Sequence, residues 1–313
     1  MSARRTPHVT TGAYAPPPAR RTLEAVSADG SRLHVEVHGA EDAPAVVLAH
    51  GWTCSTAFWA AQIRDLAVTH RVIAYDQRGH GRSPAARSYT ADALADDLIA
   101  VLAATLAPGE RAVVAGHSMG GMTVMAAAGR PGFDERVAAA LLCSTGSSRL
   151  VAEARVVPLR AGRARTRMTG AVLGSRAPLG PVTPVARAML KYATMGPGSA
   201  PDRVEACARI VHGCPTAVRH GWSQVLAGLD LDDRLARLTV PTAVIGGTAD
   251  RLTPVGHARA LAAALPHCVG LTELTGMGHM TPIEAPEAVT RVIRELAAIA
   301  ATPTTTPTKE KTP

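Results

Sequence analysis

Short, almost uninterrupted apolar segments alternate with longer helical patterns along much of the chain. An early segment, 32–39 (RLHVEVHG), alternates apolar and polar residues with a period of two, which predicts an antiparallel strand. Four later segments are short and mostly apolar: 45–50, 71–76, 111–116 and 137–144. Such segments are typical of strands buried on both faces of a parallel sheet. Helical patterns separate them, near 56–67, 90–106 and 118–130. The alternation predicts βαβ units and therefore an α/β fold.

The pattern changes after Ser144. From about 146 to 230 the sequence contains Gly, Pro, Arg, Met and short helical fragments, but no segment typical of a buried strand. Strand-like segments return at 241–247 and 269–274, with helical patterns near 256–264 and 285–300. We therefore predict one sheet domain that is interrupted by a helical insertion. The expected boundaries are 22–145 and 226–300 for the sheet domain and 146–225 for the insertion.

Both ends of the chain are polar and contain many Pro and Thr residues. Residues 1–21 and 301–313 cannot bury enough apolar surface to offset the entropy of ordering, so we expect both to be disordered. No apolar stretch follows the basic residues near the N-terminus, which argues against a secretory signal. No window reaches the roughly eighteen continuous apolar residues that a membrane span needs.

The composition narrows the class of protein. The 313 residues are 47% hydrophobic but only 3% aromatic, so Ala, Val, Leu and Ile must fill the core. The formal net charge is +8, and almost all basic residues are Arg, alongside abundant Ala, Gly and Pro. That combination is typical of a coding bias, so the charge is not taken to indicate nucleic-acid binding. The five cysteines are scattered without a C-x-x-C pair, which argues against a disulfide framework or zinc site and favours a reducing, cytoplasmic location.

The segment VVAGHSMGGM, 113–122, has Ser118 between two glycines where a predicted strand gives way to a helix. A serine hydroxyl becomes a good nucleophile only when a base removes its proton, and it must stand clear of the backbone. A sharp strand-to-helix turn exposes the hydroxyl, and Gly116 and Gly120 avoid side chains that would collide there. The helix N-terminus favours developing negative charge. The alternative is a plain tight turn with a solvated serine.

A nucleophilic serine needs a histidine as base and a carboxylate that orients the histidine. His279 lies in a Gly-containing loop directly after the last predicted strand, and Asp250 follows the preceding strand in the same way. Because sites in open α/β sheets form at the carboxyl ends of the strands, we expect Ser118, Asp250 and His279 to form a triad. Segment 144–148 contains no carboxylate, which favours Asp250 as the acid. The alternatives are a helix-capping aspartate and a structural loop histidine.

Two backbone N–H groups are expected to bind the oxyanion that forms during acyl transfer. Met119 directly follows the nucleophile and should donate the first hydrogen bond. Trp52 should donate the second, because His50 and Gly51 before it bring the backbone close to the reacting carbonyl.

Several other residues have candidate roles that we interpret as structural. His117 should point away from a turned-out Ser118, and His80 should belong to a loop that Asp76 and Arg78 hold together by hydrogen bonds. Four methionines are candidates both for lining an acyl pocket and for filling the core: Met168, Met189, Met195 and Met280.

The predicted insertion is strongly basic between 149 and 191, where nine basic residues stand against one acid, Glu153. The basic residues are Arg149, Arg155, Arg160, Arg163, Arg165, Arg167, Arg176, Arg187 and Lys191. We favour a solvated face. The main alternative is attraction of anionic substrates or association with a membrane surface, and nucleic acid is the least favoured partner.

Five sequence blocks resemble those of the α/β-hydrolase fold enzymes, in the same order. They are HGW (50–52), DQRGHGRS (76–83), GHSMGG (116–121), GTADRLTP (247–254) and GHMTPIEAPE (278–287). Apart from the insertion, the resemblance covers about 22–300. It implies an eight-stranded, mostly parallel sheet with flanking helices, and an inserted helical cap or lid from 146 to about 225. The serine at the turn argues against relatives that use an aspartate nucleophile.

These observations predict a serine hydrolase that cleaves a carboxylic ester or a related acyl compound without a metal or cofactor. The expected partner is a small, apolar acyl substrate. Other enzymatic alternatives are a thioesterase or lactonase of secondary metabolism, a carbon–carbon bond hydrolase and a cofactor-free perhydrolase. A ligand receptor on the same fold, with a retained triad, is an alternative of a different class.

Overall fold

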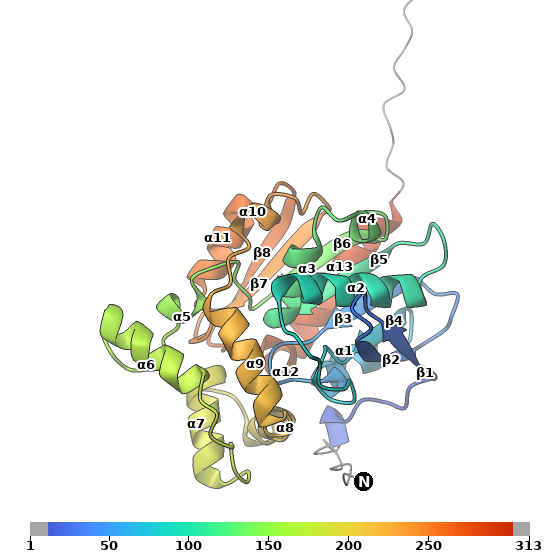
Figure 1. Ribbon diagram of the computed structural model, residues 1–313. Coiled ribbons are helices and arrows are strands. Elements are labelled where there is room, and N and C mark those ends of the chain that lie inside the picture. Colours follow the sequence, from blue (N-terminus) through green and yellow to red (C-terminus); the bar gives the residue numbers. More distant parts are fainter. Residues whose placement is uncertain (1–11, 303–313) are drawn as a thin grey trace, which may run out of the picture.

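The computed structural model describes residues 12–302, which contain one eight-stranded sheet (Figure 1). Its strands are β1 (Arg21–Val26), β2 (Arg32–His38), β3 (Ala45–Ala49), β4 (Arg71–Tyr75), β5 (Ala112–His117), β6 (Val137–Cys143), β7 (Thr242–Gly247) and β8 (Cys268–Leu274). Their order across the sheet is β1-β2-β4-β3-β5-β6-β7-β8. β2 is antiparallel to both neighbours, and all other neighbouring pairs are parallel. The fold is therefore the predicted, mostly parallel α/β architecture.

Helices cover both faces of the sheet. On one face lie α2 (Ala91–Thr105), α3 (Met119–Ala127) and α11 (Gly256–Ala264), and on the other lie α1 (Ala60–Leu66) and α13 (Pro286–Ala301). Side chains of each buried strand alternate between these two layers. Along β3, Val47 packs in the first layer, whereas Val46 and Leu48 pack in the second. This double burial explains why the central strands are apolar at almost every position.

The predicted strands and helices are present, with small shifts at their ends. The strand predicted at 32–39 is β2, and the six later strand-like segments are β3 to β8. The segment predicted as a helix at 56–67 begins as a 3-10 turn, η2 (Thr56–Trp59), before α1. Three short helices, α4 (Pro131–Asp134), α10 (Asp232–Leu235) and α12 (Thr281–Glu284), were not predicted as separate elements.

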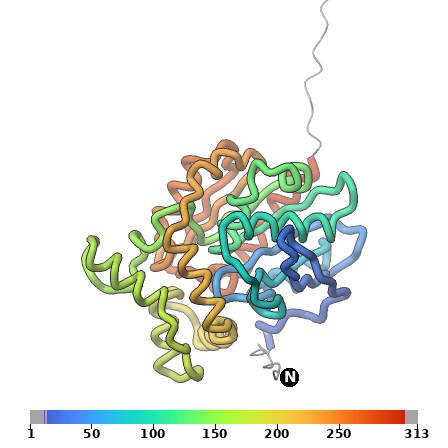
Figure 2. Tube along the Cα trace, in the orientation of Figure 1, coloured from blue at the N-terminus to red at the C-terminus, as the bar shows by residue number. Residues whose placement is uncertain are grey.

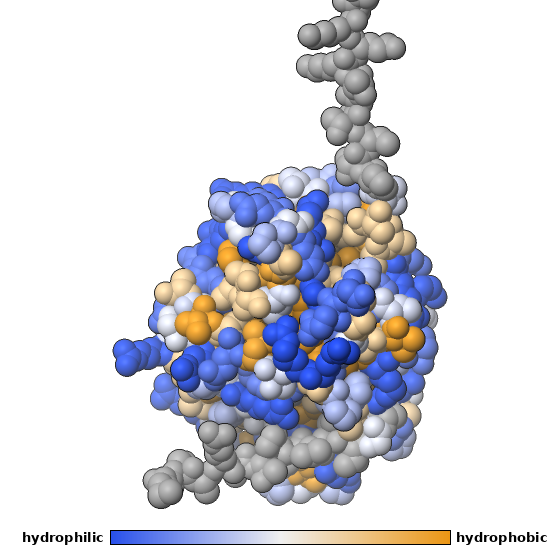
Figure 3. All heavy atoms as spheres, turned by 90° about the vertical axis from the view of Figure 1, so that its right-hand side faces the viewer, coloured by the Kyte–Doolittle hydropathy of each residue, from blue (hydrophilic) through white to orange (hydrophobic). Residues whose placement is uncertain are grey.

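The edge strand β1 has no strong apolar pattern of its own. Arg21 and Glu24 are exposed on it, and charged side chains at a sheet edge discourage pairing with another chain. This side of the molecule shows apolar residues scattered among hydrophilic ones (Figure 3). Pairing with β2, rather than local sequence, therefore defines β1.

The chain leaves the sheet after β6 and returns at β7, and the stretch between them is largely helical (Figure 2). Its helices are α5 (Leu150–Glu153), α6 (Arg163–Leu173), α7 (Pro184–Thr194), α8 (Pro201–His212), α9 (Thr216–Ala227) and the short α10. Helices α5 to α9 extend to one side of the sheet domain, and we call them the cap (Figure 1). The last cap helix ends at Ala227, slightly beyond the expected boundary at 225.

Residues 12–20 differ from the predicted N-terminal arm because they contact the folded domain. The Tyr14 hydroxyl donates a hydrogen bond to Asp202 (3.0 Å), and Arg64 donates one to the carbonyl of Ala15 (2.9 Å). The rest of the predicted arm, 1–11, lies outside the described residues, as does nearly all of the predicted tail, from 303 onward. Among the described helices, none has both the length and the apolar character that crossing a bilayer requires.

Candidate active site

The candidate nucleophile, Ser118, lies in the sharp turn between β5 and α3. Its backbone has a φ of 50° and a ψ of −117°, a strained conformation for a residue with a side chain. A Cβ atom on Gly116 would collide with the carbonyl of Gly120, and one on Gly120 would collide with the carbonyl of Ala49. The glycines therefore allow the turn that the sequence pattern predicted, and tight packing against the sheet maintains its strain.

The predicted oxyanion loop runs beside this turn. A Cβ atom added to Gly51 would lie only 3.1 Å from Cβ of Ser118, so the backbone before Trp52 passes next to the serine. The Trp52 indole N–H donates to the carbonyl of Arg219 in the cap (3.0 Å). Met119 is the first residue of α3, where backbone N–H groups have no intrahelical acceptor. Trp52 and Met119 thus flank Ser118 from two separate elements.

A buried hydrogen-bond network joins His279 to Asp250. Nδ1 of His279 lies 2.8 Å from Oδ2 of Asp250, and both residues are only 4% exposed. Oδ1 of Asp250 accepts hydrogen bonds from the backbone N–H groups of Leu252 (2.8 Å) and Thr253 (2.9 Å). The Thr253 hydroxyl donates to Oδ2 (2.9 Å) and lies 3.2 Å from Nδ1 of His279. The carboxylate is therefore held by four partners, a geometry that fixes the imidazole and favours a proton on its Nδ1. Sequence reasoning did not single out Thr253.

His117 is buried beside His279 and, like Ser118, is among the residues that line the cavity described below. Its Nε2 lies 2.9 Å from the carbonyl oxygen of His279, and its ring packs against Phe58. Burial lowers the pKa of His117 well below its ordinary value, because the charged form would lose its hydration. The ring is therefore neutral and donates through Nε2, and it adds no positive charge below the candidate base.

The loop around His279 is also held by Glu284, a residue to which the sequence analysis assigned no role. The buried carboxylate of Glu284 accepts hydrogen bonds from the N–H groups of Gly278 and Met280, which flank His279 (3.1 Å each). It also accepts from Gly196 N–H and the Ser199 hydroxyl at the end of the cap helix α7 (2.6 Å each). Its presence in the block GHMTPIEAPE was the only sequence signal.

The loop that contains His80 has the predicted structural role. Asp76 accepts hydrogen bonds from the N–H groups of Thr56 (2.8 Å) and Arg82 (2.9 Å), and Nε2 of His80 accepts one from Thr53 N–H (3.2 Å). Burial raises the pKa of Asp76 to about 6 and lowers that of His80 to about 4. These buried groups hold the predicted oxyanion loop in place.

Arg78 anchors the same loop from the side of α2. Its guanidinium donates two hydrogen bonds to Asp97 (2.7 and 2.6 Å) and one to Asp29 (2.9 Å). Arg78 and Asp97 are both buried, so this pair is shielded from water.

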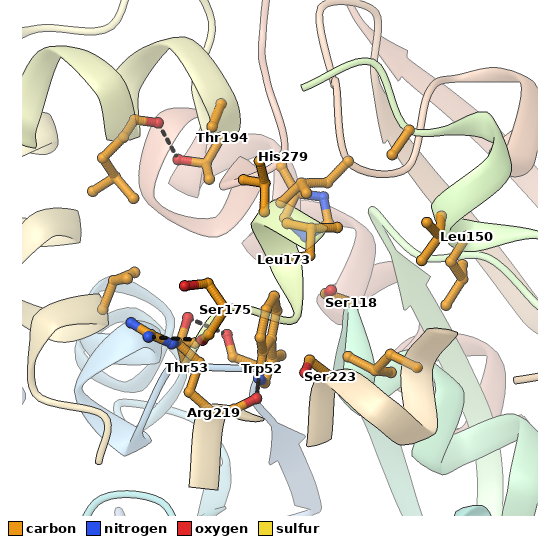
Figure 4. A pocket seen from close by; sticks show the side chains of 18 of the residues that line it. Trp52, Thr53, Ser118, Leu150, Leu173, Ser175, Thr194, Arg219, Ser223 and His279 are labelled. Atoms are coloured by element: carbon orange, nitrogen blue, oxygen red, sulfur yellow. Dashed lines mark hydrogen bonds between the residues drawn. The ribbon is translucent and has the colours of Figure 1, made fainter. Parts of the chain in front are cut away.

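A cavity of about 630 Å³ opens above Ser118 and His279, and their side chains face the same space (Figure 4). The sheet domain supplies its floor, and the cap supplies most of its walls, including Leu173, Leu190 and Leu226. The walls are mainly aliphatic. A cavity of this size and character suits a compact apolar acyl group.

Only two of the four candidate methionines have one of the two expected roles. Met280 lines the cavity and Met195 is buried, whereas Met168 and Met189 are 49% and 68% exposed on cap helices. Met122, which the sequence analysis did not name, also lines the cavity.

The nine basic residues between 149 and 191 do not line the cavity, and most of them are exposed. Arg219 of α9, which was not among the sequence candidates, does line it. Within residues 12–302, no three His, Cys, Asp or Glu side chains are grouped as they would be around a metal ion.

Comparisons with known proteins identify the family of the chain. The family model described as the alpha/beta hydrolase fold matches residues 44–286. The chain belongs to the α/β hydrolase family. It is 34% identical over 229 residues to the carbamate hydrolase candidate RutD of Variovorax paradoxus, covering 71% of this chain and 80% of that protein. It is 26% identical over 275 residues to 3-oxoadipate enol-lactonase 2 of Acinetobacter baylyi, covering 86% of this chain and 94% of the relative.

Solved structures support the same assignment. A thermophilic esterase from Thermogutta terrifontis matches with a TM-score of 0.73 and 25% identity, covering 90% of this chain and all of the esterase. The enol-lactonase from Burkholderia xenovorans matches with a TM-score of 0.68 and 25% identity, covering 88% of this chain and all of the lactonase. This α/β hydrolase is therefore an enzyme of a hydrolytic family with a small-molecule substrate.

Proposed function

We propose that this α/β hydrolase cleaves a carboxylic ester or a related acyl compound through a serine acyl-enzyme. Ser118 Oγ attacks the substrate carbonyl while Nε2 of His279 accepts the hydroxyl proton. Asp250 holds Nδ1 of His279 and stabilises the imidazolium that forms. The protonated His279 then donates its proton to the leaving group.

The N–H groups of Trp52 and Met119 are proposed to bind the oxyanion of the tetrahedral intermediate. Water then attacks the acyl-enzyme with His279 as general base, which releases the acid and restores Ser118. In this proposal 146–225 acts as a cap that selects the acyl group, and the core comprises 22–145 and 226–300. The basic outer face of the cap is proposed to be solvated, and it also permits association with an anionic surface.

One observation carries the proposal: the strained Ser118 and His279, which is paired with the buried Asp250, line one apolar cavity. A strained turn persists only where the surrounding packing maintains it. A strand-to-helix turn of this kind exposes the serine hydroxyl as a nucleophile, which gives the strain a catalytic purpose.

The test compares two serines of the same cavity. Ser118→Ala should abolish turnover of short 4-nitrophenyl esters and labelling by a fluorophosphonate. Ser223→Ala is the matched control, because the Ser223 hydroxyl also lines the cavity but donates to the carbonyl of His220 in its own helix (2.7 Å). Retention of most activity in Ser118→Ala would refute the mechanism.

A lactone is the second candidate substrate, because the names of two relatives describe enol-lactonases and a lactone is a cyclic ester that the same steps open. A panel of lactones, thioesters, esters and β-diketones separates lactonase, thioesterase, esterase and carbon–carbon hydrolase activity, and peroxide with a short acid detects perhydrolysis. Slow single labelling with tight ligand binding, in place of turnover, would indicate a ligand receptor.

A further inference from the structure

Arg219 is a buried cation in the wall of the candidate active-site cavity. It lies on the cap helix α9 and is only 6% exposed. Among the described residues that line this cavity it is the one Lys or Arg, and none of them is Asp or Glu. The wall therefore contains a positive charge and no negative charge, although it is otherwise mainly aliphatic.

The guanidinium of Arg219 uses only part of its hydrogen-bonding capacity. Nη2 donates to the carbonyl oxygens of Ser175 (3.2 Å) and Ala177, both of which also line the cavity (Figure 4). Within residues 12–302, Nε and Nη1 of Arg219 make no hydrogen bond, and neither atom is sealed from solvent. No carboxylate of the described chain lies within ion-pair distance of Arg219.

Arg78 gives a useful contrast within the same molecule. Its guanidinium is also buried, but Asp97 and Asp29 neutralise it. Burying a charge without an opposite charge is costly, and two carbonyl dipoles offset this cost only in part. Among the residues that the structure describes, Arg219 therefore has no anionic partner of the kind that a buried arginine ordinarily has.

We propose that Arg219 binds a carboxylate of the substrate, so that the preferred substrates are acyl compounds with an anionic group remote from the scissile bond. Nε and Nη1 keep N–H groups that the described chain does not use, and each of them can donate a charge-assisted hydrogen bond to a carboxylate oxygen. Trp52 links the two ends of this site, because its indole N–H donates to the Arg219 carbonyl while its own backbone is the proposed oxyanion donor. This inference rests on the proposed function.

The first test measures turnover of paired substrates. 4-Nitrophenyl esters of adipic, suberic and sebacic acid are compared as the free half-acid and as its methyl ester, so that only the remote charge differs. At one or more chain lengths the half-acid should have the higher kcat/KM. Arg219→Gln should lower the ratio of kcat/KM for that half-acid to kcat/KM for its methyl ester by roughly 30-fold or more.

Two controls separate this site from the basic outer face of the cap. Arg176→Gln removes an exposed charge between Ser175 and Ala177, whose carbonyls accept from Arg219, and it should leave the preference for the half-acid intact. Arg219→Lys keeps the charge and should retain part of the preference. Because a buried pair is screened less than a surface pair, the preference of the wild type should persist at about 0.5 M salt.

The second test needs no turnover. Binding of suberate and of octane-1,8-diol, an uncharged and non-hydrolysable ligand of the same chain length, to the wild-type protein is measured by calorimetry and repeated with Arg219→Gln. Tighter binding of suberate in the wild type supports the proposal even where the variant fails to fold. Equal binding of the two ligands, or a suberate preference that survives intact in folded Arg219→Gln, would overturn it. If the wild type prefers suberate and folded Arg219→Gln does not, but no ester is turned over, the result would contradict the esterase function and still support the anion site.

Discussion

Removing the carboxylate of Glu284 should uncouple the cap from the loop that carries His279. Glu284 is 2% exposed, and its carboxylate accepts hydrogen bonds from Gly196 N–H, Ser199 Oγ, Gly278 N–H and Met280 N–H. Two of these donors belong to the segment that follows α7, and the other two flank the candidate base. Glu284→Ala and Glu284→Gln test how much this one side chain contributes to stability and to catalysis.

The magnitude follows from the donors that would lose their acceptor. A buried donor without a partner costs about 1–3 kcal/mol, and Glu284→Ala leaves four such donors. Water that enters the new space relieves part of this cost, so we expect a loss of about 4 kcal/mol or more, a large share of the total of about 5–15 kcal/mol for a domain. Glu284→Gln keeps the shape but loses the charge and turns an amide N–H₂ toward N–H donors. For this variant we expect a loss of about 2–4 kcal/mol.

The same change should lower turnover. His279 N–H donates to the carbonyl of Thr194 (2.7 Å), and the Glu284 bonds fix the residues on both sides of His279. A misplacement of about 1 Å in a catalytic group costs roughly 100-fold in rate, so kcat of Glu284→Gln should fall at least tenfold with a smaller change in KM.

Urea unfolding followed by circular dichroism gives the stability, and ester hydrolysis by the folded fraction gives kcat. Glu287→Gln is the matched control, because Glu287 is an exposed carboxylate at the start of α13. The reasoning is refuted if Glu284→Gln unfolds at the same urea concentration as Glu287→Gln and retains wild-type kcat.

Three further outcomes are expected. Asp250→Asn should lower kcat for 4-nitrophenyl acetate by roughly 10³-fold, because an amide favours the wrong tautomer of the base; near-normal kcat would point to another acid. Arg163→Gln, on the exposed outer face of the cap, should leave kcat/KM for a neutral ester unchanged at low and high salt, and a clear drop would assign that face a role in substrate capture. Acid should destabilise the fold: burial lowers the pKa of His50 to about 3 and that of His80 to about 4, so below about pH 6.5 the unfolded chain binds protons that the folded chain does not. The free energy of unfolding should therefore fall by about 1.4 kcal/mol per pH unit for each of these histidines between about pH 6 and 4. Asp76 opposes this loss in part, because burial raises its pKa to about 6 and the folded chain therefore binds a proton there. Urea midpoints at several pH values measure the effect, and a midpoint that does not change with pH would contradict it.

The candidate triad was predictable because its geometry follows from local signals and sheet topology. Ser118, Asp250 and His279 each come directly after a parallel strand, namely β5, β7 and β8. The carboxyl ends of such strands meet at one edge of the sheet, so adjacency in space follows from position in the sequence. The glycines around Ser118 indicate, from the sequence alone, that the backbone at this turn leaves no room for side chains two residues before and after the serine.

The environment of Arg219 could not be predicted in the same way. Its sequence neighbourhood, AVRHGW, has no feature that distinguishes it from the other arginines. Two features make it unusual: no carboxylate among the described residues lies within ion-pair distance, and its side chain lies in a cavity wall. Both depend on how α9 packs in the folded protein. The methionines could not be assigned from sequence for the same reason. Both Met189 and Met280 were candidates for lining the pocket, and packing places Met280 in the cavity wall and leaves Met189 exposed.

Contacts at the end of α7 connect the cavity wall to the loop of the candidate base. Thr194 lines the cavity, and its carbonyl accepts the hydrogen bond from His279 N–H. Gly278 packs so closely against the backbone of Met195 and Gly196 that a side chain at position 278 would collide with it. A cap that only covered the cavity could vary freely in sequence and position. This cap also supports the loop of the candidate base, so changes at residues 194–196 should affect the proposed catalysis, whereas changes in the wall formed by α6 should alter only the shape of the cavity.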